Sequence, residues 1–318
     1  MSHAWDGLRA EIPRDRYGRP MIRQPDGSTI PYTRASSLGK VLEDQAALTS
    51  WKQRMTLVGA SLADHIMVSV AAHRENLDAN KTKLNQLAQQ ALDAAQAHGR
   101  AEIGTALHRL TQTLDEGRDP GPYPAQFVGD VGAYLKRTAG WVYAGMEKFV
   151  VCDDLQVAGS FDRLRVMPDG SRRIVDLKTG SSVDYSGLSI AVQLAIYAHG
   201  HLYDPTTGER TPLTGVDQAR ADVVHLPVGG ARCDVRPVDI AKGWEAAHLA
   251  IKAKAMRADA RHWIAPAEQP DHAGLADLIG AAATPGHLTA LWKAFGSDFT
   301  PDLLKLAAAR HALLAAGA

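Results

Sequence analysis

Cysteine is scarce in this chain of 318 residues, which contains only Cys152 and Cys233. Two cysteines so far apart in the sequence form no disulfide framework, and they cannot supply the four thiolates of a zinc or iron–sulfur site. We therefore expect a reducing compartment, the cytoplasm, and no iron–sulfur cluster.

Long apolar runs and an excess of charge of one sign are also missing. No apolar run approaches membrane-spanning length, and residues 1–16 mix charges without an apolar segment, so we expect no membrane partner. Lys plus Arg equals Asp plus Glu at 35 each, and this balance predicts no general attraction to nucleic acid. Basic residues do gather within 9–40 and 163–178. A solvated surface is the simplest interpretation of both clusters, but the aspartates among the residues of the second favour a functional one.

Three common catalytic motifs are absent from the chain. There is no Gly-x-x-x-x-Gly-Lys-[Ser/Thr] loop, no His-Glu-x-x-His and no Gly-x-Ser-x-Gly. These absences exclude a recognisable ATP motor and the commonest metalloproteases and serine hydrolases. A motor protein would therefore have to be a separate partner.

Hydrophobic periodicity predicts an α/β (α+β) fold with a mixed sheet flanked by helices. Residues 1–35 are rich in Pro, Gly and Arg and predict an irregular arm with a hairpin tip at Gln24–Gly27. Ser36 and Ser37 are expected to cap a helix. Helical patterning then continues to residue 117, with breaks expected near Thr49, 76–80 and Gly99. The core elements expected next are a helix at 124–145, strands at 147–152, 157–166 and 173–177, a helix at 189–203, strands at 221–228 and 232–237, and a helix at 239–260.

Beyond the core, a linker at 265–270 is expected to precede three short helices, at 273–282, 285–295 and 300–315. These patterns predict three regions: a basic arm with helices at 1–99, the core at 100–263, and the linker with a small helical unit at 264–318. The last unit is either an interaction module or a piece that packs against the core.

Two aspartates lie on the strands of a predicted hairpin. The turn residues Pro168–Ser171 separate the β-prone runs 157–166 and 173–177. Asp162 and Asp176 are therefore expected on adjoining strands, where their carboxylates can converge on one ion.

The same hairpin carries a lysine that suits phosphodiester hydrolysis. Asp176 and Lys178 are two residues apart, so their side chains leave the same face of the strand. Carboxylates with waters and phosphate oxygens suit Mg²⁺, and the backbone carbonyl of Leu177 is a further expected ligand. Lys178 would orient or activate the attacking water and offset the developing phosphate charge. The alternative is an ordinary pair of surface strands.

Residues on two predicted helices provide context. His108 lies at the edge of the apolar face of one helix, where it is either a metal ligand or a core histidine. Gln193 and Tyr197 are one turn apart on another helix and share a face. They are placed to reach a phosphate or to brace the lysine, unless that face is simply half-buried.

In this order, these residues resemble the RecB-like branch of the PD-(D/E)xK nuclease superfamily. The family pattern is Gly-x-x-x-His on a helix, Gly-x-x-Asp and Asp-x-Lys-Thr-Gly on successive strands, and Gln-x-x-x-Tyr on a helix. The resemblance implies a restriction-endonuclease-like core, with metal ligands at His108, Asp162 and Asp176 and a catalytic lysine at Lys178. It also places Glu147 at the opening of the first strand, as a second-metal ligand or only a strand-end charge. The matching blocks are Gly104 with His108, Gly159 with Asp162, Asp176–Gly180, and Gln193 with Tyr197.

The arm and the helical tail are similar to those of exonucleases encoded by actinobacterial phages and likened to CRISPR adaptation nucleases. Those adaptation nucleases hold an iron–sulfur cluster that two cysteines cannot build, and relatives carry a glutamate where this chain has Gln112. The resemblance implies a Mg²⁺- or Mn²⁺-dependent DNA exonuclease in replication, recombination or repair, phage-encoded and acting in the host cytoplasm, with a separate helicase or recombinase as partner. The alternatives are a structure-specific endonuclease of the same fold and a non-catalytic DNA-binding recombination accessory protein. Phosphate contacts without base reading are expected from the arm and from Arg163, Arg165, Arg172 and Arg173.

Overall fold

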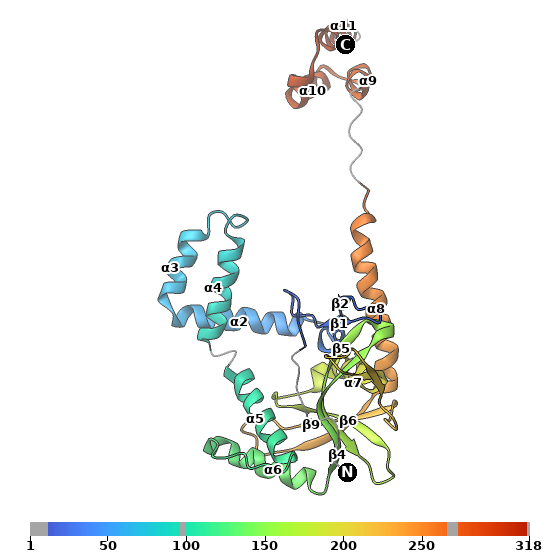
Figure 1. The fold of residues 1–318 in the computed structure, drawn as a ribbon. Helices are drawn as coiled ribbons and strands as arrows, with labels where there is room; N and C mark the ends of the chain where they lie inside the picture. The colour runs from blue at the N-terminus through green and yellow to red at the C-terminus, as the bar shows by residue number, and fades with distance from the viewer. Residues whose placement is uncertain (1–11, 96–98, 266–272, 317–318) are drawn as a thin grey trace. The chain divides into compact units, whose positions relative to one another are not determined.

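The computed structural model describes residues 12–95, 99–265 and 273–316 (Figure 1). The chain divides into two compact units, Met1–Ala258 and Asp259–Ala318. Apart from Ala265, the predicted linker at 265–270 lies outside the described residues, as does Arg9 of the predicted basic arm.

An eight-stranded mixed sheet forms the centre of the first unit. Its strands are β3 (Thr33–Arg34), β4 (Val142–Cys152), β5 (Val157–Val166), β6 (Arg172–Lys178), β7 (His201–Tyr203), β8 (Arg210–Pro212), β9 (Arg220–His225) and β10 (Asp234–Asp239). The order across the sheet is β10-β9-β6-β5-β4-β7-β8, with β3 beside β5. The β6–β9 and β3–β5 pairs are parallel and the others antiparallel. Together with the flanking helices, this sheet confirms the predicted mixed α/β architecture.

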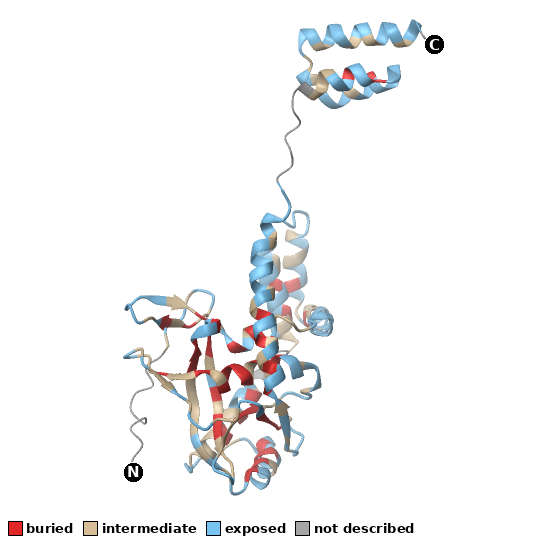
Figure 2. Cartoon of the chain, turned by 90° about the vertical axis from the view of Figure 1, so that its right-hand side faces the viewer, coloured by how far each residue is buried: buried red, intermediate tan, exposed pale blue. Residues whose placement is uncertain are grey.

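Each face of the sheet has its own hydrophobic core (Figure 2). Alternation along β6 sends Ile174 to one core and Val175 to the other, as expected for a strand that is buried on both faces. The Ile174 side is covered by α7 (Gly187–His199) and α8 (Ile240–Asp259), and the Val175 side by α5 (Gly99–Asp115) and α6 (Val128–Thr138). The Asp176–Lys178 motif therefore lies on a strand packed between helical layers.

The N-terminal region forms a hairpin and four helices. The predicted tip at Gln24–Gly27 is confirmed, because it joins β1 (Met21–Arg23) to β2 (Thr29–Pro31). The predicted cap at Ser36 and Ser37 is wrong: both lie inside the first helix, which follows Arg34. The chain breaks before residue 46 and at Ala63 rather than near Thr49. The helices are α1 (Ala35–Gly39), α2 (Ala46–Leu62), α3 (Asp64–His73) and α4 (Lys81–Ala94).

Two predicted core helices are too long at their C-terminal ends. The helix expected at 124–145 ends at Thr138, because the β-prone residues from Val142 onward pair with β5. The helix expected to reach Tyr203 ends at His199, because residues 201–203 pair with β4 as strand β7. In both cases pairing with a distant strand outweighs local helical pattern.

The second unit contains three helices, α9 (Ala273–Ala281), α10 (Pro285–Phe295) and α11 (Pro301–Ala316), close to the predicted ranges. They pack around a small core that includes Ile279, Ala282 and Leu288. Across the described residues, no individual helix has both the length and the apolar character to cross a bilayer; taken together, the sharply bent pair α2 and α3 meets those two criteria.

Candidate active site

The ladder of paired residues between β5 and β6 ends next to the two aspartates that the sequence predicts as metal ligands. Its last register pair is Arg163 with Val175, so Asp162 and Asp176 lie just beyond the paired region. There the Leu177 N–H donates a 2.7 Å hydrogen bond to Asp162 Oδ2 instead of to a β5 carbonyl. At the end of the ladder, a hydrogen bond from the backbone to a side chain therefore takes the place of pairing between the two backbones.

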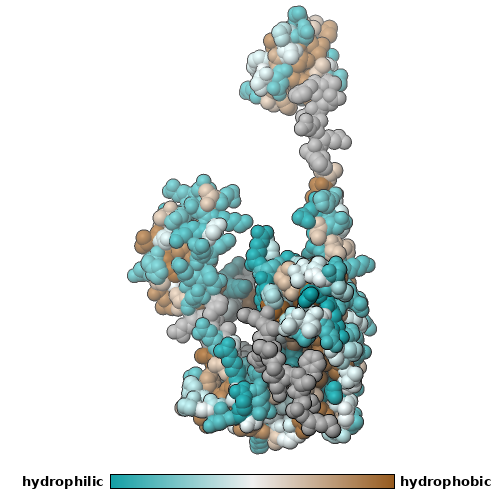
Figure 3. Space-filling model, in the orientation of Figure 1, coloured by the Kyte–Doolittle hydropathy of each residue, from teal (hydrophilic) through white to brown (hydrophobic). Residues whose placement is uncertain are grey.

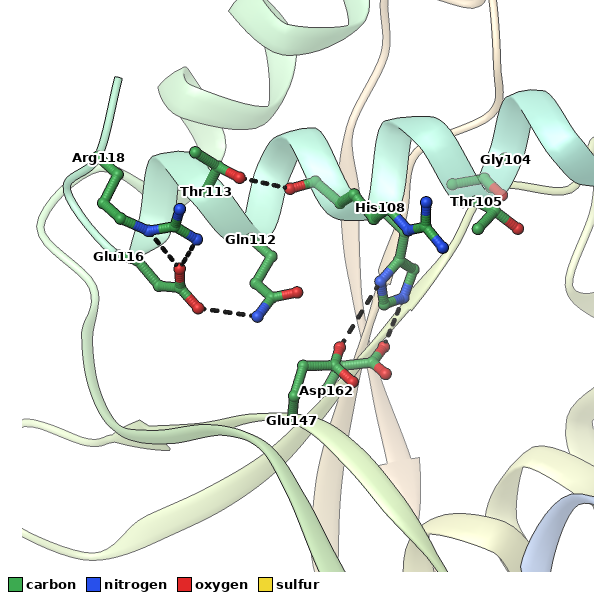
Figure 4. A pocket seen from close by; sticks show the side chains of 11 residues that line it. Gly104, Thr105, His108, Gln112, Thr113, Glu116, Arg118, Glu147 and Asp162 are labelled. Carbon is green, nitrogen blue, oxygen red and sulfur yellow. Dashed lines mark hydrogen bonds and ion pairs between the residues drawn. The ribbon is translucent and has the colours of Figure 1, made fainter. Parts of the chain in front are cut away.

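Three side chains from three elements converge at this point (Figure 4). Asp162 Oδ2 lies 2.9 Å from His108 Nε2 of α5, and Glu147 Oε1 of β4 lies 3.9 Å from His108 Nδ1. One potential ligand atom from each residue lies within 4.8 Å of the others. We call these three residues the acid–histidine cluster.

The sequence predicts that Glu147 opens its strand, but Glu147 lies inside β4, which begins at Val142. Its neighbours Met146 and Lys148 pair with Arg163 and Phe161, which places Glu147 opposite Asp162. Its φ of 48° is in the left-handed region, which a non-glycine residue adopts at a cost of about 1–3 kcal/mol. Backbone strain of this kind is typical of functional sites, so this conformation favours the ligand interpretation over that of a strand-end charge.

Asp176 faces a different set of partners from Asp162. Its Oδ2 lies 2.8 Å from Lys178 Nζ, and Gln193 Nε2 donates to its Oδ1 at 3.4 Å and to the Tyr197 hydroxyl at 3.1 Å. Asp176 is not part of the acid–histidine cluster. Tyr197 is buried and Gln193 is half-buried, and the bridge that Gln193 forms between the Tyr197 hydroxyl and Asp176 is suited to bracing the site.

The motif glycines allow these elements to approach closely. A Cβ on Gly104 would lie 2.5 Å from Thr179 Oγ1, so glycine lets α5 pass over the end of β6. A Cβ on Gly159 would lie 3.0 Å from the Tyr197 ring, so glycine lets α7 seat that ring against β5. The glycines of two motif blocks are thus required by packing against residues of the other two.

Burial and charge separate the two carboxylates electrostatically. Burial and the nearby charge of Asp162 raise the pKa of Asp176 to about 6, against the opposing effect of Lys178. Burial alone would raise the pKa of Asp162 too, but the hydrogen bonds from His108 and Leu177 hold it below its ordinary value. Burial disfavours charge on His108, yet Asp162 leaves the imidazole pKa above its usual range.

We expect stabilisation of the chain by Mn²⁺ to weaken as the pH falls through about 6. Asp176 with its raised pKa takes up a proton there, and a protonated carboxyl or imidazolium does not bind a metal. In the metal-free chain the sign is opposite: the contribution of Asp176 to folding stability is full below its unfolded pKa of 3.8 and is lost as the pH rises through about 6. Thermal unfolding with Mn²⁺ or EDTA from pH 5 to 7.5 measures both trends. A metal-induced shift that is the same at both ends of this range would contradict the expectation.

The residues present fit a hard divalent cation. The acid–histidine cluster offers one imidazole and two carboxylates, and Asp176 adds a buried carboxylate nearby. Oxygen-rich sets suit Mg²⁺ and Mn²⁺, and imidazole is compatible with Mn²⁺. The set contains no cysteine.

The prediction that Arg163 contacts DNA phosphates is wrong. Its side chain is 1% exposed, and Nε lies 2.5 Å from Asp115 Oδ2. Nη2 donates to Thr111 Oγ1 at 2.9 Å, and the Tyr134 hydroxyl donates to the same Asp115 oxygen at 2.6 Å. Arg163 is therefore part of a buried network that joins β5 to α5 and α6. No local residue pattern signals this buried network, because its partners are far apart in the chain.

The basic residues nearer the hairpin turn are also engaged within the fold. Arg165 stacks on Trp141, with 3.6 Å from the guanidinium carbon to the ring centre. Arg173 Nη1 lies 3.5 Å from Asp222 Oδ1, and Arg165 shares that carboxylate at 3.9 Å. These contacts leave less positive charge for DNA than the sequence predicts.

Replacing Asp115 by alanine is expected to destabilise the first unit by about 3–5 kcal/mol, because it leaves the Arg163 guanidinium buried without a counter-charge. Urea unfolding followed by circular dichroism measures the loss. Lys242→Ala, which removes the lysine of an exposed ion pair with Asp239, is the matched control and should leave the midpoint unchanged. Equal midpoints for the two variants would show that the buried network is not needed for stability.

A cavity of about 720 Å³ opens beside the acid–histidine cluster. Most of the residues that line this cavity were not predicted from the sequence, although those on α5 are separated from His108 by intervals that follow the helical period. The position where relatives carry glutamate is Gln112, which donates to Glu116 Oε1 at 2.8 Å, so the acid here lies one turn further on. The lining residues are Gly104, Thr105, His108, Arg109, Gln112, Thr113, Glu116, Arg118, Glu147, Asp162 and Thr179.

Carboxylates and a lysine on neighbouring strands of a mixed sheet meet a histidine of α5 beside a polar cavity, an arrangement expected of a metal-dependent nuclease. Comparison with protein-family models agrees: the model of the PD-(D/E)XK nuclease superfamily matches residues 71–269, which include all four motif blocks. The chain belongs to this superfamily. A search of curated proteins found no match.

Proposed function

We propose that this chain is a Mg²⁺- or Mn²⁺-dependent DNA exonuclease of the RecB-like branch, active in replication, recombination or repair. The observation that carries the proposal is the ion pair between the buried Asp176 carboxylate and the half-buried Lys178 ammonium, beside the acid–histidine cluster. Binding alone does not need such a set, which argues against an accessory protein without activity. Similarity of the arm and tail to phage exonucleases supports a phage origin and action in the host cytoplasm.

The proposed metal ligands are His108, Asp162, Asp176 and the Leu177 carbonyl, with Glu147 for a second ion. A bound Mg²⁺ or Mn²⁺ supplies a water of lowered pKa and neutralises phosphate charge. In the metal-free chain each of these two carboxylates has its own partner, the His108 imidazole for Asp162 and the Lys178 ammonium for Asp176. Because these partners compensate the carboxylates, the site can fold without unbalanced negative charge.

Lys178 is proposed to act as a cation and hydrogen-bond donor. Burial opposes its charge, but Asp176 at 2.8 Å raises the pKa of the ammonium above its ordinary value. A charged lysine does not accept a proton at neutral pH. It can orient the attacking water through its N–H bonds and offset the charge that develops on the phosphate.

Gln193 and Tyr197 are proposed as positioning residues. The Gln193 amide bridges the Tyr197 hydroxyl and Asp176 Oδ1. Since Tyr197 is buried against Gly159 of β5, this bridge fixes the Asp176 carboxylate relative to the strand that carries Asp162.

A comparison of linear and covalently closed circular DNA tests the proposal. The purified chain is incubated with each substrate, end-labelled where linear, in Mg²⁺, Mn²⁺ or EDTA. Metal-dependent loss of linear DNA alone supports an exonuclease. Cleavage of the circle instead indicates an endonuclease, and DNA binding without degradation under any metal indicates an accessory protein.

A further inference from the structure

The polar face of α5 forms a continuous wall of the cavity that begins at the acid–histidine cluster. Its residues recur at helical spacing, whereas Leu107 and Leu110 on the other face enter the core beneath α5. The visible surface over α5 is hydrophilic (Figure 3). The polar residues are Thr105, His108, Arg109, Gln112, Thr113 and Glu116.

Charge along this wall is unevenly compensated. At the far end, Glu116 is paired with Arg118 and also accepts from Gln112. Arg109 is exposed and lines the cavity, and among the residues that the structure describes its guanidinium has no carboxylate partner. An uncompensated arginine one residue from His108 offers an anion-binding fork beside the proposed metal site.

We propose that the polar face of α5 is a subsite for the DNA strand, in which Arg109 binds a phosphate that neighbours the scissile one. The inference rests on the proposed nuclease function. From Thr105 to Asp115, the last residue of α5, the helix rises about 15 Å, which spans several nucleotides at about 3.4 Å each. Thr105, Gln112 and Thr113 line the same wall with hydroxyl and amide groups of the kind that contact phosphate oxygens. A strand whose scissile phosphate lies at the acid–histidine cluster must continue along one side of it, and this cavity provides that continuation.

Oligonucleotides with one neutral linkage test the subsite. Each duplex carries a single methylphosphonate at a different position near the labelled end, and kcat/KM is measured with Mn²⁺. The wild-type chain should lose roughly 10- to 100-fold when the neutral linkage occupies the contacted position. Arg109→Ala should lose a similar factor on unmodified DNA and nothing further at that position, and Arg109→Lys should recover part of the rate. Arg220→Ala, at an exposed arginine that opens β9, is the matched control and should behave as wild type.

Two results overturn the inference: Arg109→Ala cleaves unmodified DNA as fast as wild type, or it loses activity while keeping the wild-type sensitivity at every position. If the wild-type chain cleaves no DNA, the nuclease proposal fails, and binding of the same oligonucleotides is measured by fluorescence anisotropy. If one neutral linkage then weakens the binding of wild type but not that of Arg109→Ala, the result still supports the subsite. If no linkage position has this effect, the subsite proposal fails together with the nuclease proposal.

Discussion

Lys178→Ala should abolish DNA cleavage, with a fall in kcat of at least roughly 10²–10³-fold, while DNA binding remains. The ammonium is expected to act on the water and on the phosphate charge, which develop in the transition state and not in the bound ground state. Its loss should therefore lower kcat more than it raises KM. Single-turnover cleavage of end-labelled linear DNA and anisotropy measurements of binding separate the two effects.

The main complication is that Lys178 also compensates the buried Asp176. Removing it leaves Asp176 without its ionic partner, so the metal-free variant should be less stable than wild type. Lys178→Met keeps most of the side-chain volume and serves as a second variant. Lys252→Ala, an exposed lysine on α8, is the control and should cleave normally. Turnover retained in both Lys178 variants would falsify the assignment, provided that their circular dichroism spectra show them to be folded.

Asp162→Asn should remove metal binding and, with it, cleavage. Asp162 links the His108 imidazole and the Leu177 N–H, at 2.9 and 2.7 Å from the same oxygen, and is the member of the acid–histidine cluster that touches both. The amide has nearly the same shape but lacks the charge that a divalent cation requires from its ligands. We expect Mn²⁺ to raise the thermal midpoint of wild type but not of this variant, and calorimetry to show affinity weakened by roughly 100-fold or more.

Asp169→Asn provides a matched control on the same hairpin. Asp169 lies in the β5–β6 turn, where its carboxylate accepts hydrogen bonds from Ser171. The turn is at one end of the β5–β6 ladder, and Asp162 lies just beyond the other end. The control should retain the Mn²⁺ effect on unfolding and full cleavage. If Asp162→Asn binds Mn²⁺ as tightly as Asp169→Asn does, the ion is held elsewhere and the ligand assignment is wrong.

Much of the architecture could be predicted because local patterns report it directly. The hairpin of β5 and β6 was recognisable from β-prone runs around a turn, and the helices of the second unit from three short amphipathic stretches. The ends of α6 and α7 were not predictable. There the chain changes from helix to strand because Val142 and Leu202 find strand partners that are distant in the sequence.

The sequence by itself determined the order of the motif blocks and the common face of Asp176 and Lys178, because a two-residue strand period and a linear pattern need no tertiary information. Tertiary structure alone decided the partners of these side chains. Asp162 accepts from Leu177 because the β5–β6 ladder ends at Arg163, and Glu147 reaches His108 from a left-handed conformation inside β4. Arg163 is buried rather than exposed because Asp115 and Tyr134 reach it from two helices. The physical reason is that hydrogen bonding and burial depend on strand register and on where helices cross the sheet, which the local residue pattern does not encode.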